Sequence, residues 1–231
     1  MSGAQNRFGN VLELPLFPLP VVLFPGMPMP LHIFEPRYRQ MLADIRVSDN
    51  LFGLSYFERD SAEGDAPLPG HVGCIAEVTE VQPLPDGRSN ILTMGLVRYR
   101  LESYVERGDP YLVGKVHLFE DTAEDEELLA RRAGEVSELF VRIARAVRTL
   151  NDERASLPEL PETDPERLSF LVAGAMDLEA EAKQEMLELR YASERLKRLR
   201  ELLSRAVSGY EERARVHLIA KRNGHTGKQP E

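Results

Sequence analysis

The pattern of hydrophobic and polar positions changes character partway along the chain. In the first part, short apolar runs alternate with Pro and Gly, which is typical of short strands joined by turns. In the second part, apolar residues recur every three or four positions, as they do on one face of a helix. We therefore expect an α+β fold, with a β-rich subdomain followed by a helical bundle subdomain. Their predicted bounds are 11–120 and 121–222, between disordered ends at 1–10 and 223–231.

One helix and one hairpin organise the predicted β-rich part. Apolar residues at helical spacing predict a helix over Glu35–Arg46, and Pro36 fits the first turn of that helix. Pro83 to Gly87 contains Pro-Asp-Gly, which favours a tight reversal between two strands. Alternate positions in the second strand of this hairpin end in Arg98 and Arg100, so we expect that end of the strand to leave the core.

Runs rich in Val, Ile, Leu, Phe and Tyr mark the strands. About six short strands with one helix indicate a small barrel or a strongly bent sheet. The predicted strands are Val11–Phe17, Val21–Phe24, Pro28–Ile33, Leu51–Phe57, Val72–Gln82, Asn90–Val105 and Tyr111–Phe119.

Helices dominate the second part of the chain. Thr122, with Asp125 three residues later, fits a capping box at the start of a long helix. A proline-bearing linker, Ser156–Thr163, ends this helix, and Asp164-Pro165 then provides an N-cap and a proline at the first helical position. Two further helices are predicted, over Leu178–Leu189 and from Ser193 to about Arg222.

Composition excludes several classes of protein. The net charge of −9 repels a phosphate backbone, so nucleic acid is an unlikely partner. Cys74 is the only cysteine, which rules out an intrachain disulfide and a Cys-rich zinc site. No apolar run reaches the roughly 20 residues that span a bilayer, so no membrane partner is expected. The N-terminus lacks a secretory signal, and we expect a cytoplasmic protein.

The motifs that would make this chain an enzyme fail on inspection. Gly108 to Val116 resembles a phosphate-binding loop but has five residues between its glycines and ends in Val where a Ser or Thr would bind magnesium. His71 and Cys74 have a metal-site spacing without the further ligands, and we favour a loop histidine beside a buried thiol. Serines near Lys197 lack the strained turn that exposes a nucleophile. We therefore predict no catalytic residue, no metal and no cofactor.

The most distinctive stretch reads Leu-Pro-Leu-Phe-Pro-Leu-Pro-Val-Val-Leu-Phe-Pro-Gly-Met-Pro-Met-Pro-Leu-His-Ile-Phe-Glu-Pro-Arg-Tyr over residues 14–38. It resembles the opening of the Lon protease N-terminal, or substrate-binding, domain, and in particular its free-standing bacterial relatives. Several motifs in the family's order make the resemblance more specific than one motif would. The further matching segments are Val81–Val105 with Gly95–Arg100, Asp164–Leu168, Lys183–Leu187 and Ser193–Leu196.

This resemblance implies a PUA-like β subdomain followed by a helical bundle. In the full protease, the domain helps to hold unfolded or tagged polypeptides for an ATPase and a Ser/Lys peptidase. The present sequence has neither the phosphate-binding loop nor the peptidase, so the resemblance implies a non-catalytic module. Its expected partners are unfolded or exposed polypeptide segments and a separate protease or chaperone, in a role in protein quality control.

Two interpretations stay open for the aromatic cluster near the predicted first helix. As a binding groove, it would use Phe17, Phe34 and Tyr38 as anchors, with Met41 beside them and Arg37 or Arg39 meeting carbonyls or acids of a client. As core, the same apolar side chains would simply be buried, which is usual for aromatic residues at strand or helix spacing.

The last predicted helix offers a second surface. Its basic residues pair with acidic neighbours in a solvated helix face, or they meet an acidic partner. An RNA-binding role through this face and a PUA-like barrel is the alternative function. The basic residues are Arg195, Lys197, Arg198, Arg200 and Arg205.

Overall fold

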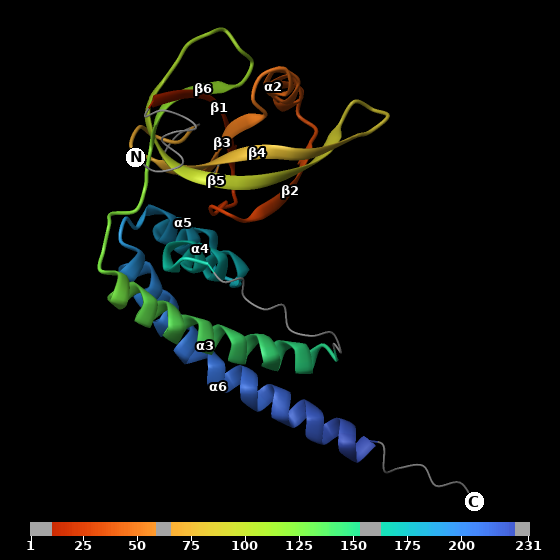
Figure 1. Ribbon diagram of the computed structural model, residues 1–231. Helices are drawn as coiled ribbons and strands as arrows, with labels where there is room; N and C mark the ends of the chain where they lie inside the picture. The colour runs from red at the N-terminus through yellow and green to blue at the C-terminus, as the bar shows by residue number, and fades with distance from the viewer. Residues whose placement is uncertain (1–10, 59–65, 153–162, 225–231) are drawn as a thin grey trace, which may run out of the picture. The chain divides into compact units, whose positions relative to one another are not determined.

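A computed structural model describes residues 11–58, 66–152 and 163–224 (Figure 1). The prediction of a disordered N-terminus over 1–10 lies outside the described residues. So do the predicted tail from residue 225 onward and the predicted linker up to residue 162. The chain forms two compact units, and both are discontinuous in sequence. The first unit comprises Met1–Thr122 and Ala173–Arg190, and the second comprises Ala123–Val172 and Tyr191–Glu231.

This division differs from the predicted split near residue 120. The chain returns to the first unit for residues 173–190, so the predicted helical subdomain over 121–222 is interrupted. Within the described residues, the first unit holds all six strands, two helices and the end of a third. These elements are β1 (Val11–Leu19), β2 (Pro28–Ile33), α2 (Pro36–Arg46), β3 (Leu51–Tyr56), β4 (Val72–Pro83), β5 (Ser89–Tyr104), β6 (Leu112–Leu118), α5 (Ala180–Glu188) and the end of α4 (Pro165–Ala175).

The strands form one mixed sheet that closes on itself. Its order is β2-β5-β4-β3-β1-β6, and a further pairing between β5 and β6 completes a ring of five strands. Strands β1 and β3 pair in parallel, whereas the other pairs are antiparallel. Figure 1 shows the long β4–β5 hairpin extending beyond this ring. The sequence-based expectation of an α+β fold with a barrel or bent sheet is confirmed.

Strand β5 can take part in three pairings because it is 16 residues long. Its first half, from Ser89 to Met94, pairs with β2, and its second half, from Tyr99 to Tyr104, pairs with β6. Its other edge pairs with β4. Strand β2 therefore lies at an edge of the sheet, outside the closed ring.

The predicted strand over Val21–Phe24 is wrong. These residues form an irregular segment that ends in a turn, where the Met27 amide donates to the Phe24 carbonyl at 3.2 Å. Proline on both sides removes backbone donors that a strand would need. Leu23 and Phe24 are nevertheless buried, so their hydrophobicity reflects core packing instead of strand pairing.

Tyr99 fills the inside of the ring. It is fully buried, and its hydroxyl lies 2.6 Å from the Ser55 hydroxyl. A Cβ added at Gly73 would lie 2.5 Å from the Tyr99 ring, and one at Gly53 would lie 2.9 Å from it. Both glycines therefore leave the space that the tyrosine ring occupies.

Arg98 departs from the prediction that this end of β5 turns to solvent. It is only 2% exposed, and it donates to the carbonyls of Leu187 and Leu189, each at 2.6 Å. Its Nη2 also pairs with Asp121 at 2.5 Å. The last carbonyls at the C-terminal end of a helix have no partners within the helix. At the end of α5, the buried Arg98 guanidinium donates hydrogen bonds to them. Arg98 thus attaches α5 to the sheet.

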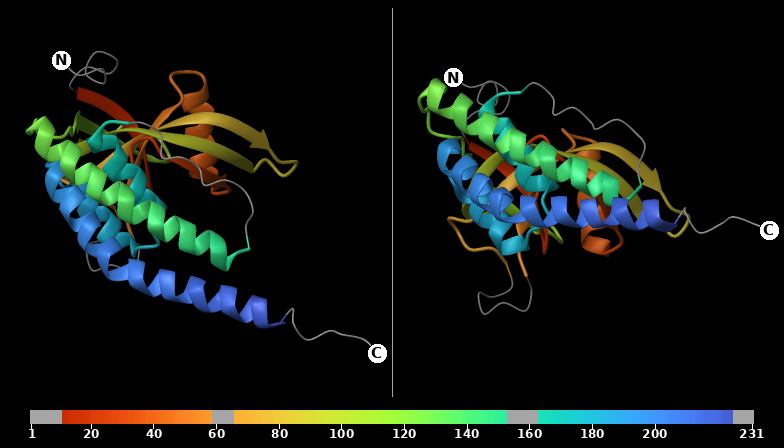
Figure 2. Two further views of the ribbon diagram at one scale, coloured as in Figure 1. Left: turned by 60° about the horizontal axis from the view of Figure 1, so that its bottom comes forward. Right: turned by 90° about the horizontal axis from the view of Figure 1, so that it is seen from below.

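The second unit consists mainly of α3 (Glu126–Leu150) and α6 (Ala192–Gly224), which run side by side in both views of Figure 2. The pairs Glu135–Arg200 at 3.6 Å and Arg142–Glu211 at 2.9 Å follow the same order in both helices, so the helices are parallel. Among the described residues, no helix is both long and apolar enough to cross a membrane.

Two local predictions for the second unit need correction. Asp125 itself caps α3, because its carboxylate accepts from the Leu128 amide at 2.8 Å, and Thr122 has no part in this cap. Arg195 does not belong to a solvated basic face. It is fully buried, donates to the Ser169 hydroxyl at 2.6 Å and stacks over the Phe170 ring.

We expect Arg98→Met to lower the free energy of unfolding by about 3–5 kcal/mol, because it removes a buried charged donor from a buried carboxylate and two carbonyls. Urea unfolding followed by far-UV circular dichroism measures this change. Arg88→Met is the matched control, since Arg88 pairs with Asp86 where both side chains are about half exposed. Similar losses in the two variants would contradict the structural role given to Arg98.

Candidate polypeptide-binding surface

The structure separates the five predicted binding residues into two groups. Phe17, Tyr38 and Met41 are buried, at 4%, 4% and 1% exposure, in the core cluster between α2 and the sheet. The rings of Phe17 and Tyr38 lie 4.0 Å apart between centroids. These three side chains hold α2 in place and do not themselves reach the surface.

Phe34 lies on the surface between β2 and α2. Its side chain is 58% exposed, which is unusual for a large aromatic residue. The His32 ring stacks with it at 6.0 Å between centroids. His32 is in turn hydrogen-bonded to Asn90, with 2.7 Å between Nδ1 and Oδ1. The exposed Phe34 ring therefore packs against a His32 ring that Asn90 holds in place.

Arg37 and Arg39 lie in the first turn of α2, three and five residues after Phe34. The Arg37 guanidinium pairs with Glu35 at 2.9 Å and lies over the Tyr38 ring, 4.5 Å from its centroid. Arg39 is exposed and borders a hollow of about 430 Å³ together with Pro36, Gln40 and Gly87. The hollow thus lies between the start of α2 and the tip of the β4–β5 hairpin.

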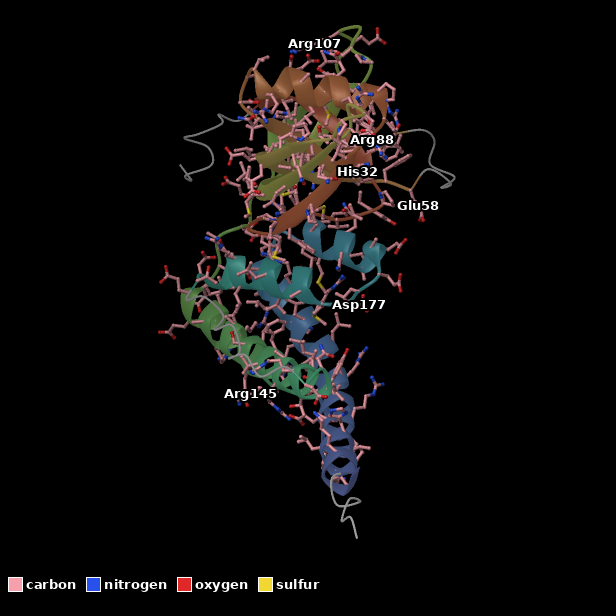
Figure 3. All side chains as sticks on the ribbon, turned by 90° about the vertical axis from the view of Figure 1, so that its right-hand side faces the viewer. His32, Glu58, Arg88, Arg107, Arg145 and Asp177 are labelled. Atoms are coloured by element: carbon pink, nitrogen blue, oxygen red, sulfur yellow. The ribbon has the colours of Figure 1, made fainter. Side chains whose placement is uncertain are left out.

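Figure 3 labels His32 near the end of β2 and Arg88 at the hairpin between β4 and β5. The register explains why these segments meet, because His32 pairs with Asn90 and Ile33 with Ser89. We refer to His32, Phe34, Arg37, Arg39 and Gly87 as the Phe34 surface. The sequence does not indicate that His32 and Gly87 lie near the start of α2, because the spatial neighbours of a residue cannot be read from it.

The Phe34 surface combines an exposed aromatic ring with two arginines. Among the described residues, no group of three or more His, Cys, Asp or Glu side chains could hold a metal ion. Cys74 is fully buried, and burial raises the pKa of its thiol to about 12. A protonated, inaccessible thiol is a poor nucleophile. Exposed aromatic rings and arginines are the residue types enriched in protein-binding surfaces.

The described residues thus form a closed mixed sheet with an exposed aromatic residue beside its edge strand. Residues 13–205 match the family described as the ATP-dependent protease La (LON) substrate-binding domain, and the chain belongs to this family.

Two solved structures share the fold. The N-terminal domain of Lon protease from Mycobacterium avium complex has a TM-score of 0.65 and 18% identity, with 84% of this chain and 98% of that one covered. A Lon N-terminal domain protein from Xanthomonas campestris has a TM-score of 0.58 and 22% identity, with 81% and 96% covered. At these identities, the two structures support the fold alone.

Curated relatives are much longer than the matched region. Lon protease 1 of Thermus thermophilus is 32% identical over 207 residues, which are 87% of this chain and 25% of the relative. Lon protease of Brevibacillus choshinensis is 29% identical over 196 residues, which are 83% and 25% of the two chains. The chain thus spans about a quarter of these relatives, and the matched family is that of their substrate-binding part.

We expect Tyr38→Ala and Phe34→Ala to differ sharply in stability. Tyr38→Ala should cost about 3–5 kcal/mol of the free energy of unfolding, because it leaves a cavity beneath α2. Phe34→Ala should stay within about 0.5 kcal/mol, because the side chain is mostly exposed. Chemical denaturation of both variants checks this. A large loss for Phe34→Ala would show that the ring belongs to the core.

The Cys74 thiol should resist labelling in the native protein. At about pH 8, well below its raised pKa, the thiol is protonated and buried, so reaction with a disulfide reagent should proceed no faster than unfolding. Full reaction of the single cysteine is expected in denaturant. Rapid labelling of the folded protein would contradict the packing around β4.

Proposed function

We propose that this chain binds unfolded or exposed polypeptide segments and performs no cleavage itself. The single observation that carries the proposal is Phe34, which is 58% exposed on the fold of a substrate-binding family, with Arg37 and Arg39 three and five residues further along the chain. Apolar segments of a client would pack on the Phe34 ring. Arg37 and Arg39 would meet the carbonyls or carboxylates of the client.

The edge position of β2 supports binding through side chains. Pro28 and Pro30 lie in this edge strand and lack backbone N–H groups, so the edge cannot pair fully with an added strand. Met29 and Leu31, which are partly buried, pack against the core below. A client would therefore be recognised by its apolar side chains more than by its backbone.

The buried members of the predicted set contribute indirectly. Phe17, Tyr38 and Met41 pack beneath α2, and this packing fixes the start of the helix from which Arg37 and Arg39 project. We assign direct contact with a client to Phe34 and the two arginines. Phe17, Tyr38 and Met41 support this surface from the core and do not contact the client.

A role in protein quality control follows from this proposal. The relatives are named Lon protease, and the matched family is the substrate-binding domain of that protease. We propose that the bound polypeptide is handed to a separate protease or chaperone. ATP hydrolysis and peptide cleavage are not assigned to the residues of this chain.

The alternative of RNA binding has less support. It relied partly on a basic face of the last helix, yet Arg195 is fully buried against Ser169 and Phe170. Arg200 lies near Glu135, which offsets its charge. The family match likewise favours polypeptide as the partner.

We expect Phe34→Ala to raise the Kd for an unfolded model protein by about tenfold, because truncation of an aromatic anchor removes a large share of the binding energy. Fluorescence anisotropy of a labelled, reduced and alkylated protein measures this Kd. Val47→Ala is the matched control, since Val47 is 89% exposed just after the other end of α2.

The same assay with labelled single-stranded RNA separates the two functions. If Phe34→Ala leaves the Kd for the unfolded protein unchanged, the Phe34 surface is not the binding site. Tight RNA binding with a steep dependence on salt, without capture of unfolded protein, would favour the alternative.

A further inference from the structure

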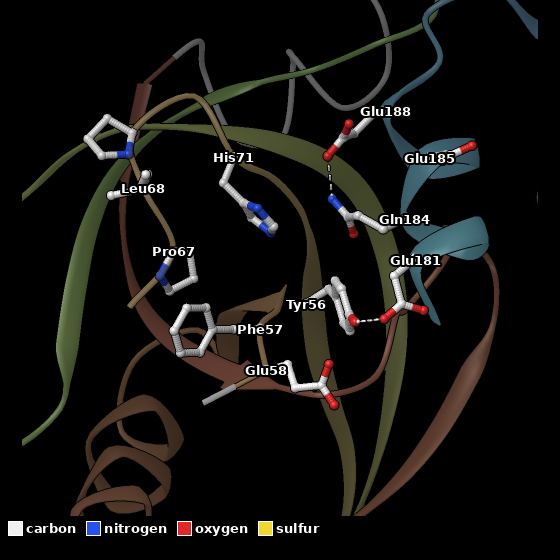
Figure 4. Close-up of a pocket in the computed structure, with 11 residues that line it drawn as sticks. Tyr56, Phe57, Glu58, Pro67, Leu68, His71, Glu181, Gln184, Glu185 and Glu188 are labelled. Atoms are coloured by element: carbon white, nitrogen blue, oxygen red, sulfur yellow. Dashed lines mark hydrogen bonds between the residues drawn. The ribbon is translucent and has the colours of Figure 1, made fainter. Parts of the chain in front are cut away.

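A second hollow, of about 450 Å³, lies in the first unit between the end of β3 and α5 (Figure 4). Phe57, Pro67 and Leu68 provide apolar walls on one side. Helix α5 provides the polar side. The hollow is separate from the Phe34 surface and shares no residue with it.

Carboxylates give this hollow a strongly negative character. Glu181, Glu185 and Glu188 lie on one face of α5, at the three- and four-residue spacing of a helix, and Glu58 also lines the hollow. None of the described residues that line the hollow is Lys or Arg. The hollow therefore favours a positively charged occupant, although an acidic cluster alone would not identify one.

Gln184 supplies the more specific observation. It lies on the same face of α5 but is only 7% exposed. Its Nε2 donates to the Val72 carbonyl and to Glu188 Oε1, each at 2.8 Å. Both partners are acceptors, so the nitrogen must face them and the assignment of the amide oxygen is fixed.

The amide oxygen of Gln184 points away from Glu188 and toward the space that the drawn residues surround (Figure 4). No described residue donates to this buried Oε1. A buried acceptor without a donor is unfavourable, and an occupant that carries N–H groups would satisfy it once the side chains that cover the oxygen shift slightly. The hollow thus calls for an occupant that is both cationic and a hydrogen-bond donor.

Tyr56 fixes one of the carboxylates. Its hydroxyl donates to Glu181 Oε1 at 2.8 Å, as the dashed line in Figure 4 marks. The pKa of Glu181 is held below its usual range, mainly by its own backbone amide and further by the Tyr56 hydroxyl. Glu181 is therefore charged at neutral pH and held in one orientation.

We propose that this hollow, which we name the α5 pocket, binds the guanidinium group of an arginine side chain in a bound polypeptide. A guanidinium has five donors in one plane, enough for Gln184 Oε1 and the carboxylates of Glu181 and Glu188 together. The apolar walls suit the methylene stem, and Tyr56 and Phe57 offer aromatic surface for a cation. Lysine has fewer donors and is more strongly hydrated.

The inference rests on the proposed function, because the arginine is taken to belong to a client polypeptide. It deepens that function by naming a residue type that clients should contain. The Phe34 surface selects apolar segments, whereas the α5 pocket selects one basic side chain.

The test uses the full chain and the short peptide acetyl-Gly-Arg-Gly-amide. Addition of the peptide to the ¹⁵N-labelled chain, followed by ¹H–¹⁵N correlation NMR, should shift the side-chain amide resonances of Gln184. The peptide with citrulline, which keeps the shape but lacks the charge, should bind at least about tenfold more weakly, and the lysine peptide at least about threefold more weakly. Equal binding of the citrulline peptide, or no shift at Gln184, would overturn the proposal.

Variants assign the binding to the pocket. Glu181→Gln should raise the Kd of the arginine peptide by about fivefold, and Glu181→Gln combined with Glu188→Gln by about twentyfold, since each loses a charged acceptor. Both glutamates are exposed, so the variants should fold, as circular dichroism can check. Glu80→Gln is the matched control, because Glu80 is exposed on β4 outside the pocket. An equal effect of Glu80→Gln would reduce the binding to general electrostatic attraction and overturn the assignment.

The outcome is distinguishable from that of the proposed function. If the unmodified chain captures an unfolded protein but does not bind the arginine peptide, the proposal for the α5 pocket is wrong and the proposed function is unaffected. If the arginine peptide binds at Gln184 but no unfolded protein is captured, the proposed function is wrong and the assignment of the α5 pocket is kept.

Discussion

The buried guanidinium of Arg98 is the interaction on which the arrangement of the first unit depends. It joins strand β5 to the carbonyls that end α5 and to Asp121, where the chain is about to leave the unit. The Thr122 amide donates to the Arg190 carbonyl at 2.8 Å, so the two points where the chain crosses to the second unit lie side by side. A guanidinium can serve this junction because its fork of donors reaches three acceptors at once. Burial makes the junction strong, because each of these polar groups would be costly without its partner.

This junction also explains how a helix from late in the sequence comes to line a pocket beside an early strand. Gln184 adds a second attachment through the Val72 carbonyl on β4. With α5 held in this way, its acidic face borders the end of β3. The proposed binding chemistry of the first unit is therefore divided between an aromatic and basic surface at α2 and an acidic hollow at α5. The first depends on core packing beneath α2, and the second depends on Arg98 and Gln184.

Much of the fold could be predicted from the sequence because the relevant signals are local. Pro-Asp-Gly near residue 86 marks the β4–β5 hairpin, and its Gly87 has the positive φ of 79° that such a turn requires. Pro36 at the start of α2 and the apolar spacing of Tyr38, Met41, Leu42 and Ile45 define an amphipathic helix whose apolar face is buried. The strand over Val21–Phe24 failed because buried apolar residues in an irregular segment have the same composition as a strand.

The sequence by itself determined most of the element types, the hairpin and the α+β class, since propensity, turn chemistry and hydrophobic spacing act over a few residues. Only the tertiary structure decided which aromatic and charged residues are buried. Phe34 and Tyr38 are four positions apart, yet one is exposed and the other lies in the core. Arg98 and Arg195 resemble surface residues until their partners, which lie 23 to 91 positions away, surround them. Burial is set by neighbours that only the folded chain brings together, and for this reason the binding surface could not be read from spacing alone.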